Sequence, residues 1–259
     1  MKINQACTII TGAASGIGLA LLQRLSASGA RIVASDIRKE PLEQICSQLA
    51  GVSREIIPFV CDLSIKEQVD DLFTYAQSTF GNIDLFIANA GFPYYELLRV
   101  ANWNHIERIF QLNVFSPIYS FQKLRQLQPN GKWKLVIVAS AMGLMAMPGY
   151  TLYSATKAAL HRFSEGIRLE MDNQQQLMVV YPITTRTAFF KAAGGDPPVP
   201  WPSHSPETVA DCIVRGIRND RREVMPSRLF ALILFLDRFQ PFIRIAYQRF
   251  YARFLKRAE

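Results

Sequence analysis

The segment Thr11-Gly-Ala-Ala-Ser-Gly-Ile-Gly18 joins a β-branched apolar run, which begins at Ala6, to a helical stretch that begins at Leu19. A strand, a glycine-rich turn and a helix form a cradle for a pyrophosphate, because glycine lets the backbone approach the ligand and the helix N-terminus offers free N–H groups. The glycines stand at Gly12, Gly16 and Gly18, which is not the G-x-G-x-x-G spacing. A tight turn without a ligand is the alternative, but the flanking strand and helix favour the phosphate site.

A second β-branched run, Arg31 to Ser35, ends at Asp36. A carboxylate about twenty positions after the glycines binds the adenosine ribose hydroxyls and repels a 2′-phosphate, so Asp36 predicts NAD as the preferred cofactor. A turn or helix-cap carboxylate is the alternative. Arg38, two residues later, is the feature that favours NADP instead.

Apolar runs continue to alternate with helical segments along the chain. Further strands are expected over residues 56–61, 83–88, 133–139 and 177–181, and helices over 41–50, 66–80, 102–127 and 151–171. This alternation predicts an α/β fold with a Rossmann-like, doubly wound parallel sheet covered by helices on both faces. Ligands of such sheets bind beyond the carboxyl ends of the strands, where the sequence places Gly12, Asp36, Asp62, Asn89, Ser140 and Pro182.

Tyr153 and Lys157 are four residues apart, about one helical turn, so their side chains lie on one helix face. A free tyrosine has a pKa of about 10, and a neighbouring cation lowers that pKa toward a useful range for acid–base chemistry. Ser140 follows the apolar run Leu135 to Ala139, and a strand end that faces the helix can bring its hydroxyl beside the phenol. Pairs with this spacing are also common on helix surfaces, so the rest of the chain must decide.

Five motifs in order resemble those of the short-chain dehydrogenase/reductase family, over about residues 5 to 225: Thr11-Gly-x-x-x-Gly-Ile-Gly18, Asn89-Ala-Gly91, Asn113, Ser140 and Tyr153-x-x-x-Lys157. The resemblance implies an NAD(P)-dependent oxidoreductase acting on CH–OH groups. It gives Tyr153 the acid–base role and makes Lys157 the residue that lowers the tyrosine pKa and holds the nicotinamide ribose. Ser140 polarises the substrate oxygen, and Asn113 holds a water in the proton relay.

The resemblance also implies the residues that bind the cofactor. They are Gly12, Ser15, Gly16, Ile17, Gly18, Asp36, Asp62, Leu63, Asn89, Ala90, Gly91, Tyr153, Lys157, Pro182 and Thr187. The chain departs from the family pattern twice. Ile183 replaces the glycine that usually follows the proline, and Ala88 replaces the first asparagine of Asn-Asn-Ala-Gly.

The substrate is expected to be a hydrophobic, lipid-like or steroid-like alcohol or ketone, because the segments around the site are mostly apolar. They contribute Tyr94, Tyr95, Met142, Leu144, Met145, Met147, Phe189, Phe190 and Trp201, with Lys191 as a charged contact. Packing of these side chains in the core is the alternative. The glycine- and proline-rich residues 194–202 are predicted to form a lid. A non-catalytic dinucleotide sensor or scaffold is the alternative function, which the intact catalytic set disfavours.

Residues 227–259 extend beyond the dinucleotide-binding and catalytic domain expected over 1–226. Eight apolar residues, Leu229 to Leu236, are too few to cross a bilayer, which needs about twenty. Seven basic and two acidic residues give this extension a net charge of +5, out of +8 for the chain. Bulky apolar residues interleaved with arginines predict two helices, separated at Pro241, that lie on a membrane surface. Packing on the sheet edge or on a partner subunit is the alternative, and nucleic-acid binding suits this pattern less well.

The 259 residues are 49% hydrophobic, which allows a substantial core in one large domain or two small ones. Four scattered cysteines and three histidines without ligand spacing predict neither a disulfide framework nor a metal site. The N-terminal apolar run is too short for a signal peptide. We therefore expect a cytoplasmic protein, peripheral at a membrane surface, and the family resemblance implies a homo-oligomer.

Overall fold

The computed structural model describes residues 1–259 except 51–54, 190–200, 238, 240–241 and 256–259. Within the described residues the chain forms a seven-stranded sheet of order β3-β2-β1-β4-β5-β6-β7, and every neighbouring pair is parallel. The strands are β1 Cys7–Thr11, β2 Arg31–Asp36, β3 Ile56–Val60, β4 Leu85–Ala88, β5 Lys134–Val138, β6 Leu177–Val180 and β7 Glu223–Val224. The central strands are continuous apolar runs because both faces of a parallel sheet are covered.

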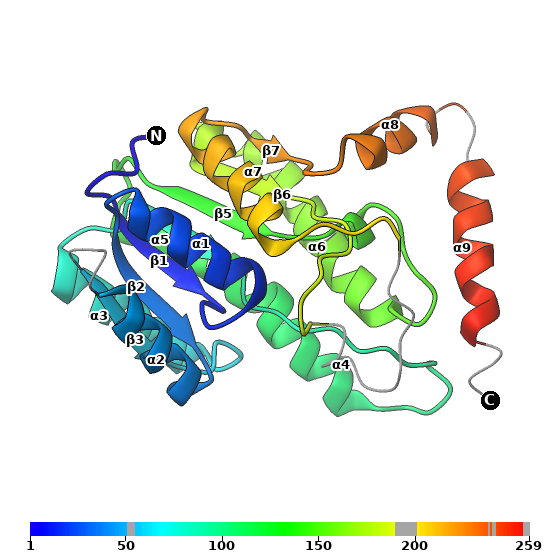
Figure 1. The fold of residues 1–259 in the computed structure, drawn as a ribbon, viewed down its shortest axis with the longest axis horizontal. Coiled ribbons are helices and arrows are strands. Elements are labelled where there is room, and N and C mark those ends of the chain that lie inside the picture. The colour runs from blue at the N-terminus through cyan, green and yellow to red at the C-terminus, as the bar shows by residue number, and fades with distance from the viewer. Residues whose placement is uncertain (51–54, 190–200, 238, 240–241, 256–259) are drawn as a thin grey trace.

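Helices cover the two faces of this sheet (Figure 1). One layer consists of α1 Gly16–Ala27, α2 Lys39–Leu49 and α7 Pro206–Arg218, whose buried side chains share one core cluster. The other layer consists of α3 Lys66–Phe80, α5 Ser116–Leu127 and α6 Thr151–Leu169, which share a second cluster. The predicted doubly wound α/β fold is confirmed.

The strand order reverses at β1, which lies between β2 and β4. Connections run to opposite sides from this point, so the loops after β1 and β4 diverge and leave a crevice at the carboxyl edge. The expected ligand positions Gly12, Asn89 and Ser140 follow strand ends at this edge, and Asp36 is the last residue of β2.

Sequence interpretation missed α7 and β7, although α7 has a readable start. The Ser205 hydroxyl accepts a hydrogen bond from the Thr208 backbone N–H at 3.2 Å, and Pro206 occupies the first turn. A serine cap followed by proline is a common helix start. Buried apolar residues then recur at helical spacing: Val209, Ala210, Ile213, Val214 and Ile217.

The long helix expected over 102–127 is interrupted. It consists of α4 Trp103–Phe110, a π-helical turn Gln111–Phe115 and α5. Pro117 has no N–H, so it cannot bond the carbonyl of Asn113 four residues earlier, and an α-helix cannot continue unchanged here. The wider turn carries Asn113.

The C-terminal extension forms α8 Arg228–Asp237 and α9 Phe242–Leu255, as the break at Pro241 predicted. Both helices lie at the opposite end of the molecule from β3 and α2 (Figure 1). Of the helices in the described part of the chain, none has the length and apolar character needed to cross a membrane.

Candidate active site

The turn after β1 is shaped to receive a phosphate. Gly12 and Gly16 have φ angles of +65° and +54°, which other residues rarely adopt. A Cβ on Gly18 would lie 2.0 Å from the Gly12 carbonyl oxygen, so only glycine fits there. Ser15 is the N-cap of α1, and its side chain makes no capping hydrogen bond. Within the described part of the chain, the first-turn N–H groups have no side-chain acceptor, which fits the pyrophosphate of a dinucleotide.

Asn89 and Thr11 hold the loops after β4 and β1 together. The Thr11 hydroxyl donates to the Ile87 carbonyl at 3.1 Å and accepts from the backbone N–H groups of Asn89 and Ala90, both at 3.0 Å. The Asn89 side-chain amide donates to the Thr11 carbonyl at 3.0 Å. These bonds fix both walls of the crevice beside the glycine turn.

Asp36 is buried at the end of β2 and is fully occupied by local donors. Its Oδ2 accepts from the Ala14 N–H at 3.0 Å and from Arg38 Nη2 at 3.2 Å, and its Oδ1 accepts from Arg38 Nε at 3.0 Å. Arg38 Nη2 also donates to the Ser15 hydroxyl at 2.8 Å. The arginine therefore bridges the acidic residue and the glycine turn.

A single cleft of about 560 Å³ runs along this edge of the sheet. It is lined by Ser140, Tyr153 and Lys157 and by all of the predicted cofactor residues except Gly18. Gly18 packs under the turn, against Gly12. Asn113 is the other predicted residue outside the lining, because it lies one layer deeper. The cleft volume falls in the range of small-molecule sites.

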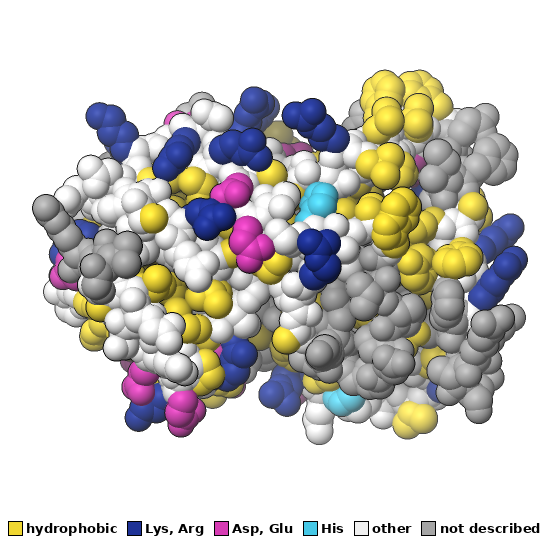
Figure 2. All heavy atoms as spheres, viewed as in Figure 1, with side chains coloured by type: hydrophobic (Ala, Val, Ile, Leu, Met, Phe, Trp, Pro, Cys, Tyr) yellow, Lys and Arg dark blue, Asp and Glu magenta, His cyan; other side chains and the backbone are white. Residues whose placement is uncertain are grey.

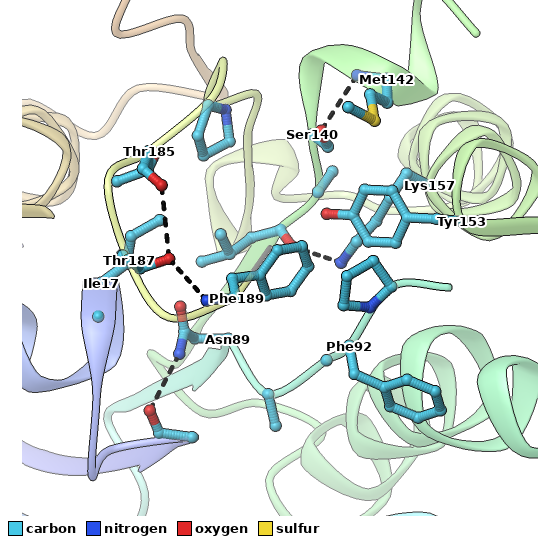
Figure 3. A pocket seen from close by; sticks show the side chains of 18 of the residues that line it. Ile17, Asn89, Phe92, Ser140, Met142, Tyr153, Lys157, Thr185, Thr187 and Phe189 are labelled. Carbon is cyan, nitrogen blue, oxygen red and sulfur yellow. Dashed lines mark hydrogen bonds between the residues drawn. The ribbon is translucent and has the colours of Figure 1, made fainter. Parts of the chain in front are cut away.

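Tyr153 and Lys157 are both buried and lie together on the first turns of α6 (Figure 3). The Lys157 ammonium donates to the Val138 carbonyl at 3.0 Å and lies 5.6 Å from the centre of the Tyr153 ring. Burial lowers the pKa of Lys157 to about 8. Burial also raises the pKa of Tyr153, and the nearby Ser140 hydroxyl opposes that rise.

The shift of the Tyr153 pKa is therefore opposite to the predicted direction. Loss of solvation disfavours the phenolate, and the Lys157 ammonium is directed to the Val138 carbonyl. Ser140 is the N-cap of a short 3-10 turn, Ala141–Gly143, and its oxygen accepts from the Met142 N–H at 3.1 Å. The strand end after β5 thus brings this hydroxyl to the phenol, as the sequence predicted.

Asn113 ties the π-helical turn to the loop after β4. Its Oδ1 accepts from the Phe92 N–H at 3.1 Å, and its Nδ2 donates to the Phe92 carbonyl at 3.0 Å and to the Thr156 hydroxyl at 3.2 Å. Gly91 lies against it, since a Cβ there would be 2.9 Å from Asn113 Oδ1 and 3.6 Å from Lys157 Nζ. Asn113 therefore adjoins Lys157 from behind the cleft wall.

Some of the residues predicted for the substrate side line the cleft. Met142, Met145, Met147 and Phe189 line the cleft, and the Phe189 ring meets Tyr153 edge-on at 5.5 Å. The other described candidates do not line it: Leu144 packs in the core, Tyr94 stacks on His105, Tyr95 packs on Tyr150, and Trp201 is exposed. Phe190, Lys191 and most of the predicted lid fall outside the described residues.

The extension contributes to the cleft, which sequence interpretation missed. Leu229, Phe230 and Ile233 of α8 line it, together with Arg244 and Tyr247 of α9. No local sequence pattern indicates that residues 228–255 line the same cleft as Tyr153 and Lys157.

A family model for short chain dehydrogenases matches residues 6–197. The chain belongs to the short chain dehydrogenase family. It is therefore an oxidoreductase, as the motifs predicted. This dehydrogenase is 32% identical over 170 residues to an uncharacterized oxidoreductase of Staphylococcus aureus, a match that covers 65% of this chain and 73% of the relative.

Two further comparisons extend this family assignment. An NADPH-dependent 1-acyldihydroxyacetone phosphate reductase of Saccharomyces cerevisiae is 32% identical over 169 residues, which covers 63% of this dehydrogenase and 55% of the yeast protein. A short chain dehydrogenase/reductase from Burkholderia phymatum, solved in complex with NAD, has a TM-score of 0.83 at 20% identity and covers 94% of this chain and 96% of its own. This likeness shows the shared fold.

Proposed function

We propose that this dehydrogenase interconverts an alcohol and a ketone of a hydrophobic substrate, with NAD(P) as the redox cofactor and Tyr153 as the acid–base group. The observation that carries this proposal is the buried Tyr153 phenol beside Ser140, in a cleft otherwise lined mainly by apolar side chains. A panel of hydrophobic alcohols and ketones, followed by nicotinamide absorbance, tests the activity. Absence of turnover across the panel with both cofactors would contradict it.

When bound, the nicotinamide accepts or supplies the hydride. Gly12 to Ile17 would hold its pyrophosphate, Asp62 and Leu63 the adenine, and Asn89 to Gly91 the adjoining wall. Pro182 and Thr187 would hold the carboxamide end. In reduction, the Tyr153 phenol donates a proton to the carbonyl oxygen, and in oxidation its phenolate takes the hydroxyl proton.

Three further residues would support Tyr153. The Ser140 hydroxyl would polarise the substrate oxygen. Lys157 would hold the ribose and counter the phenolate charge once it turns from the Val138 carbonyl. Asn113 would hold a water that connects this group to solvent. No observation favours the non-catalytic alternative, since Ser140, Tyr153 and Lys157 meet in one cleft and Asn113 adjoins them.

The preferred cofactor is proposed to be NAD. Asp36 places a carboxylate at the end of β2, and the nearest cation that could attract a 2′-phosphate, Arg38, has its Nε and Nη2 donors occupied by Asp36 and Ser15. The yeast relative is NADPH-dependent, and the Burkholderia structure holds NAD, so the family context allows either cofactor.

We expect wild type to bind NAD more tightly than NADP, and Asp36→Asn to narrow the ratio of the two dissociation constants by about tenfold. The change removes the repelling charge and frees Arg38 from its ion pair while keeping the side-chain size. Calorimetric titration with both cofactors measures the ratio. Arg38→Gln is the matched variant and should weaken NADP in the Asp36→Asn background. Tighter NADP binding by wild type would reverse this proposal.

The extension is proposed to contact a membrane surface. On α8 and just after it, Leu229, Leu232, Phe235, Leu236 and Phe239 are between 42% and 71% exposed. Figure 2 shows hydrophobic side chains gathered at this end of the molecule, with basic side chains on the adjacent edge. The neighbouring outward residues of α9 include Arg249, Phe250 and Arg253. Exposed apolar groups beside cations suit the boundary of an anionic bilayer.

We expect wild type to float with vesicles that contain anionic lipid and a Leu232→Glu/Phe235→Glu variant to remain unbound. Neither side chain lines the cleft, so the fold and the site are spared. A Val100→Glu/Leu169→Glu variant, whose apolar residues are 82% and 88% exposed elsewhere, is the matched control and should float. Equal recovery of wild type and the α8 variant in the unbound fraction would refute membrane contact. Sedimentation would then test whether this face joins two copies in the proposed homo-oligomer.

A further inference from the structure

The charged side chains that line the cleft are segregated by position. Among the described residues they are Asp36, Arg38, Asp62, Arg108, Lys157 and Arg244. Both carboxylates follow β2 and β3, at the end proposed for adenosine. The described lining at the opposite end, around Tyr153, carries cations and no carboxylate. Since Lys157 is bonded to the Val138 carbonyl and assigned to the cofactor ribose, Arg108 and Arg244 are the two cations on the substrate side.

Arg244 stands on the inner side of α9, and this helix is fixed to the catalytic part of the chain. The Tyr247 hydroxyl donates to the Trp201 carbonyl at 2.8 Å, and the Tyr251 hydroxyl accepts from the Trp201 N–H at 3.0 Å. Gln248 Nε2 donates to the Ala146 carbonyl at 2.7 Å. The helix therefore holds the Arg244 side chain at a set place in the cleft wall.

The Arg244 guanidinium is oriented by an ion pair, but its hydrogen-bond donors are not all used. Its Nε lies 3.0 Å from Asp237 Oδ2, across the junction of α8 and α9. No other acceptor among the described residues takes a hydrogen bond from it, and its Nε is buried without an aligned partner. Arg108 differs, because it is exposed at the rim with its guanidinium 5.7 Å from the Phe92 ring centre. A guanidinium with open donors beside apolar surface binds carboxylate or phosphate groups by paired, charge-assisted hydrogen bonds.

We propose that the substrate is an apolar chain that carries an anionic group, a carboxylate or a phosphate, and that Arg244 binds this group. The apolar part would contact Met142, Met145, Phe189, Phe230 and Ile233, which line the same end of the cleft. This inference rests on the proposed function for the identity of the substrate end, and it names the substrate class and a specificity-determining residue in the C-terminal extension.

The test is calorimetric binding of dodecanoate, dodecyl phosphate and dodecanol, below their micellar concentrations, to the full chain. Wild type should bind at least one anion about 10- to 100-fold more tightly than dodecanol, the range of a charge-assisted contact. Arg244→Gln should remove that preference and leave the dodecanol affinity unchanged. Arg244→Lys should restore part of it. The better of the two anions identifies the group that the cleft accepts.

Arg125→Gln is the matched control, because Arg125 is exposed on α5, lies outside the cleft lining and undergoes the identical charge change. It should bind all three probes as wild type does. The proposal is overturned if wild type shows no anion preference or binds none of the probes. It is also overturned if Arg244→Gln weakens dodecanol and the anions equally, or if Arg125→Gln has the same effect. These binding results do not depend on turnover, so failure of the proposed reaction is detected separately by the absorbance assay.

Discussion

Replacing Tyr153 with phenylalanine is expected to lower kcat by about 10²–10⁴-fold, the usual contribution of a positioned acid–base group. The ring and its edge-on contact with Phe189 are kept, so the loss reports the hydroxyl alone. Dissociation constants for NAD(P) should change little, because the proposed cofactor contacts are otherwise retained. Steady-state kinetics on a hydrophobic ketone and calorimetry with the cofactor measure both quantities. A variant that keeps a rate near wild type would show that Tyr153 is not the proton donor.

Tyr119→Phe is the matched control for this change. The Tyr119 hydroxyl donates to Asp70 Oδ1 at 2.8 Å, on the surface between α3 and α5, and does not line the cleft. Its removal should cost about 1 kcal/mol of stability and leave kcat unchanged. Equal losses of activity in both variants would point to a general effect of deleting a phenol hydroxyl.

The raised pKa of Tyr153 also predicts how the rate of each reaction direction depends on pH. Below its pKa the phenol is protonated, which is the form that donates a proton in carbonyl reduction. Oxidation needs the phenolate, whose population increases as pH rises toward the raised pKa. The kcat/KM for oxidation should therefore keep rising with pH while that for reduction stays on its low-pH plateau and falls only as pH passes the raised pKa, and Tyr153→Phe should remove both dependences.

The location of the site could be predicted from sequence because its chemistry depends on local patterns. The glycine turn, Asp36 and Ser140 all follow apolar runs, and parallel strands bring their carboxyl ends to one edge whatever the details of packing. Tyr153 and Lys157 share a helix face through spacing alone. These are short-range constraints, and the structure has them where they were expected.

Two features could not be derived from local patterns. The Tyr153 pKa depends on how deeply α6 is buried and on where the Lys157 ammonium points, and both are set by tertiary packing. The place of Arg244 in the cleft depends on the path of α8 and α9, whose contacts join residues far apart in sequence, such as Gln248 and Ala146. The π-helical turn at Asn113 is an intermediate case, because Pro117 marks it in advance.

A single added methyl group at Gly18 is expected to destabilise the protein by about 3 kcal/mol and to abolish dinucleotide binding. The new Cβ would lie 2.0 Å from the Gly12 carbonyl oxygen and 2.7 Å from the Asn89 side-chain amide. Neither group can move away easily, because the Gly12 carbonyl belongs to the backbone and the Asn89 amide is hydrogen-bonded to the Thr11 carbonyl. The glycine turn must therefore open, and the first-turn N–H groups of α1 then lose their common direction.

Gly166→Ala is the control for the same chemical change, and it is expected to raise the stability of the protein instead of lowering it. Gly166 lies inside α6, it is exposed, and a Cβ there would meet no heavy atom within 4 Å. Alanine should stabilise the helix by about 1 kcal/mol, because glycine loses more backbone entropy on folding. Urea unfolding followed by circular dichroism gives both values, and calorimetry gives the cofactor affinity. Similar unfolding midpoints for the two variants would mean that the turn after β1 tolerates a side chain at Gly18, and its assignment as a close-packed phosphate cradle would be wrong.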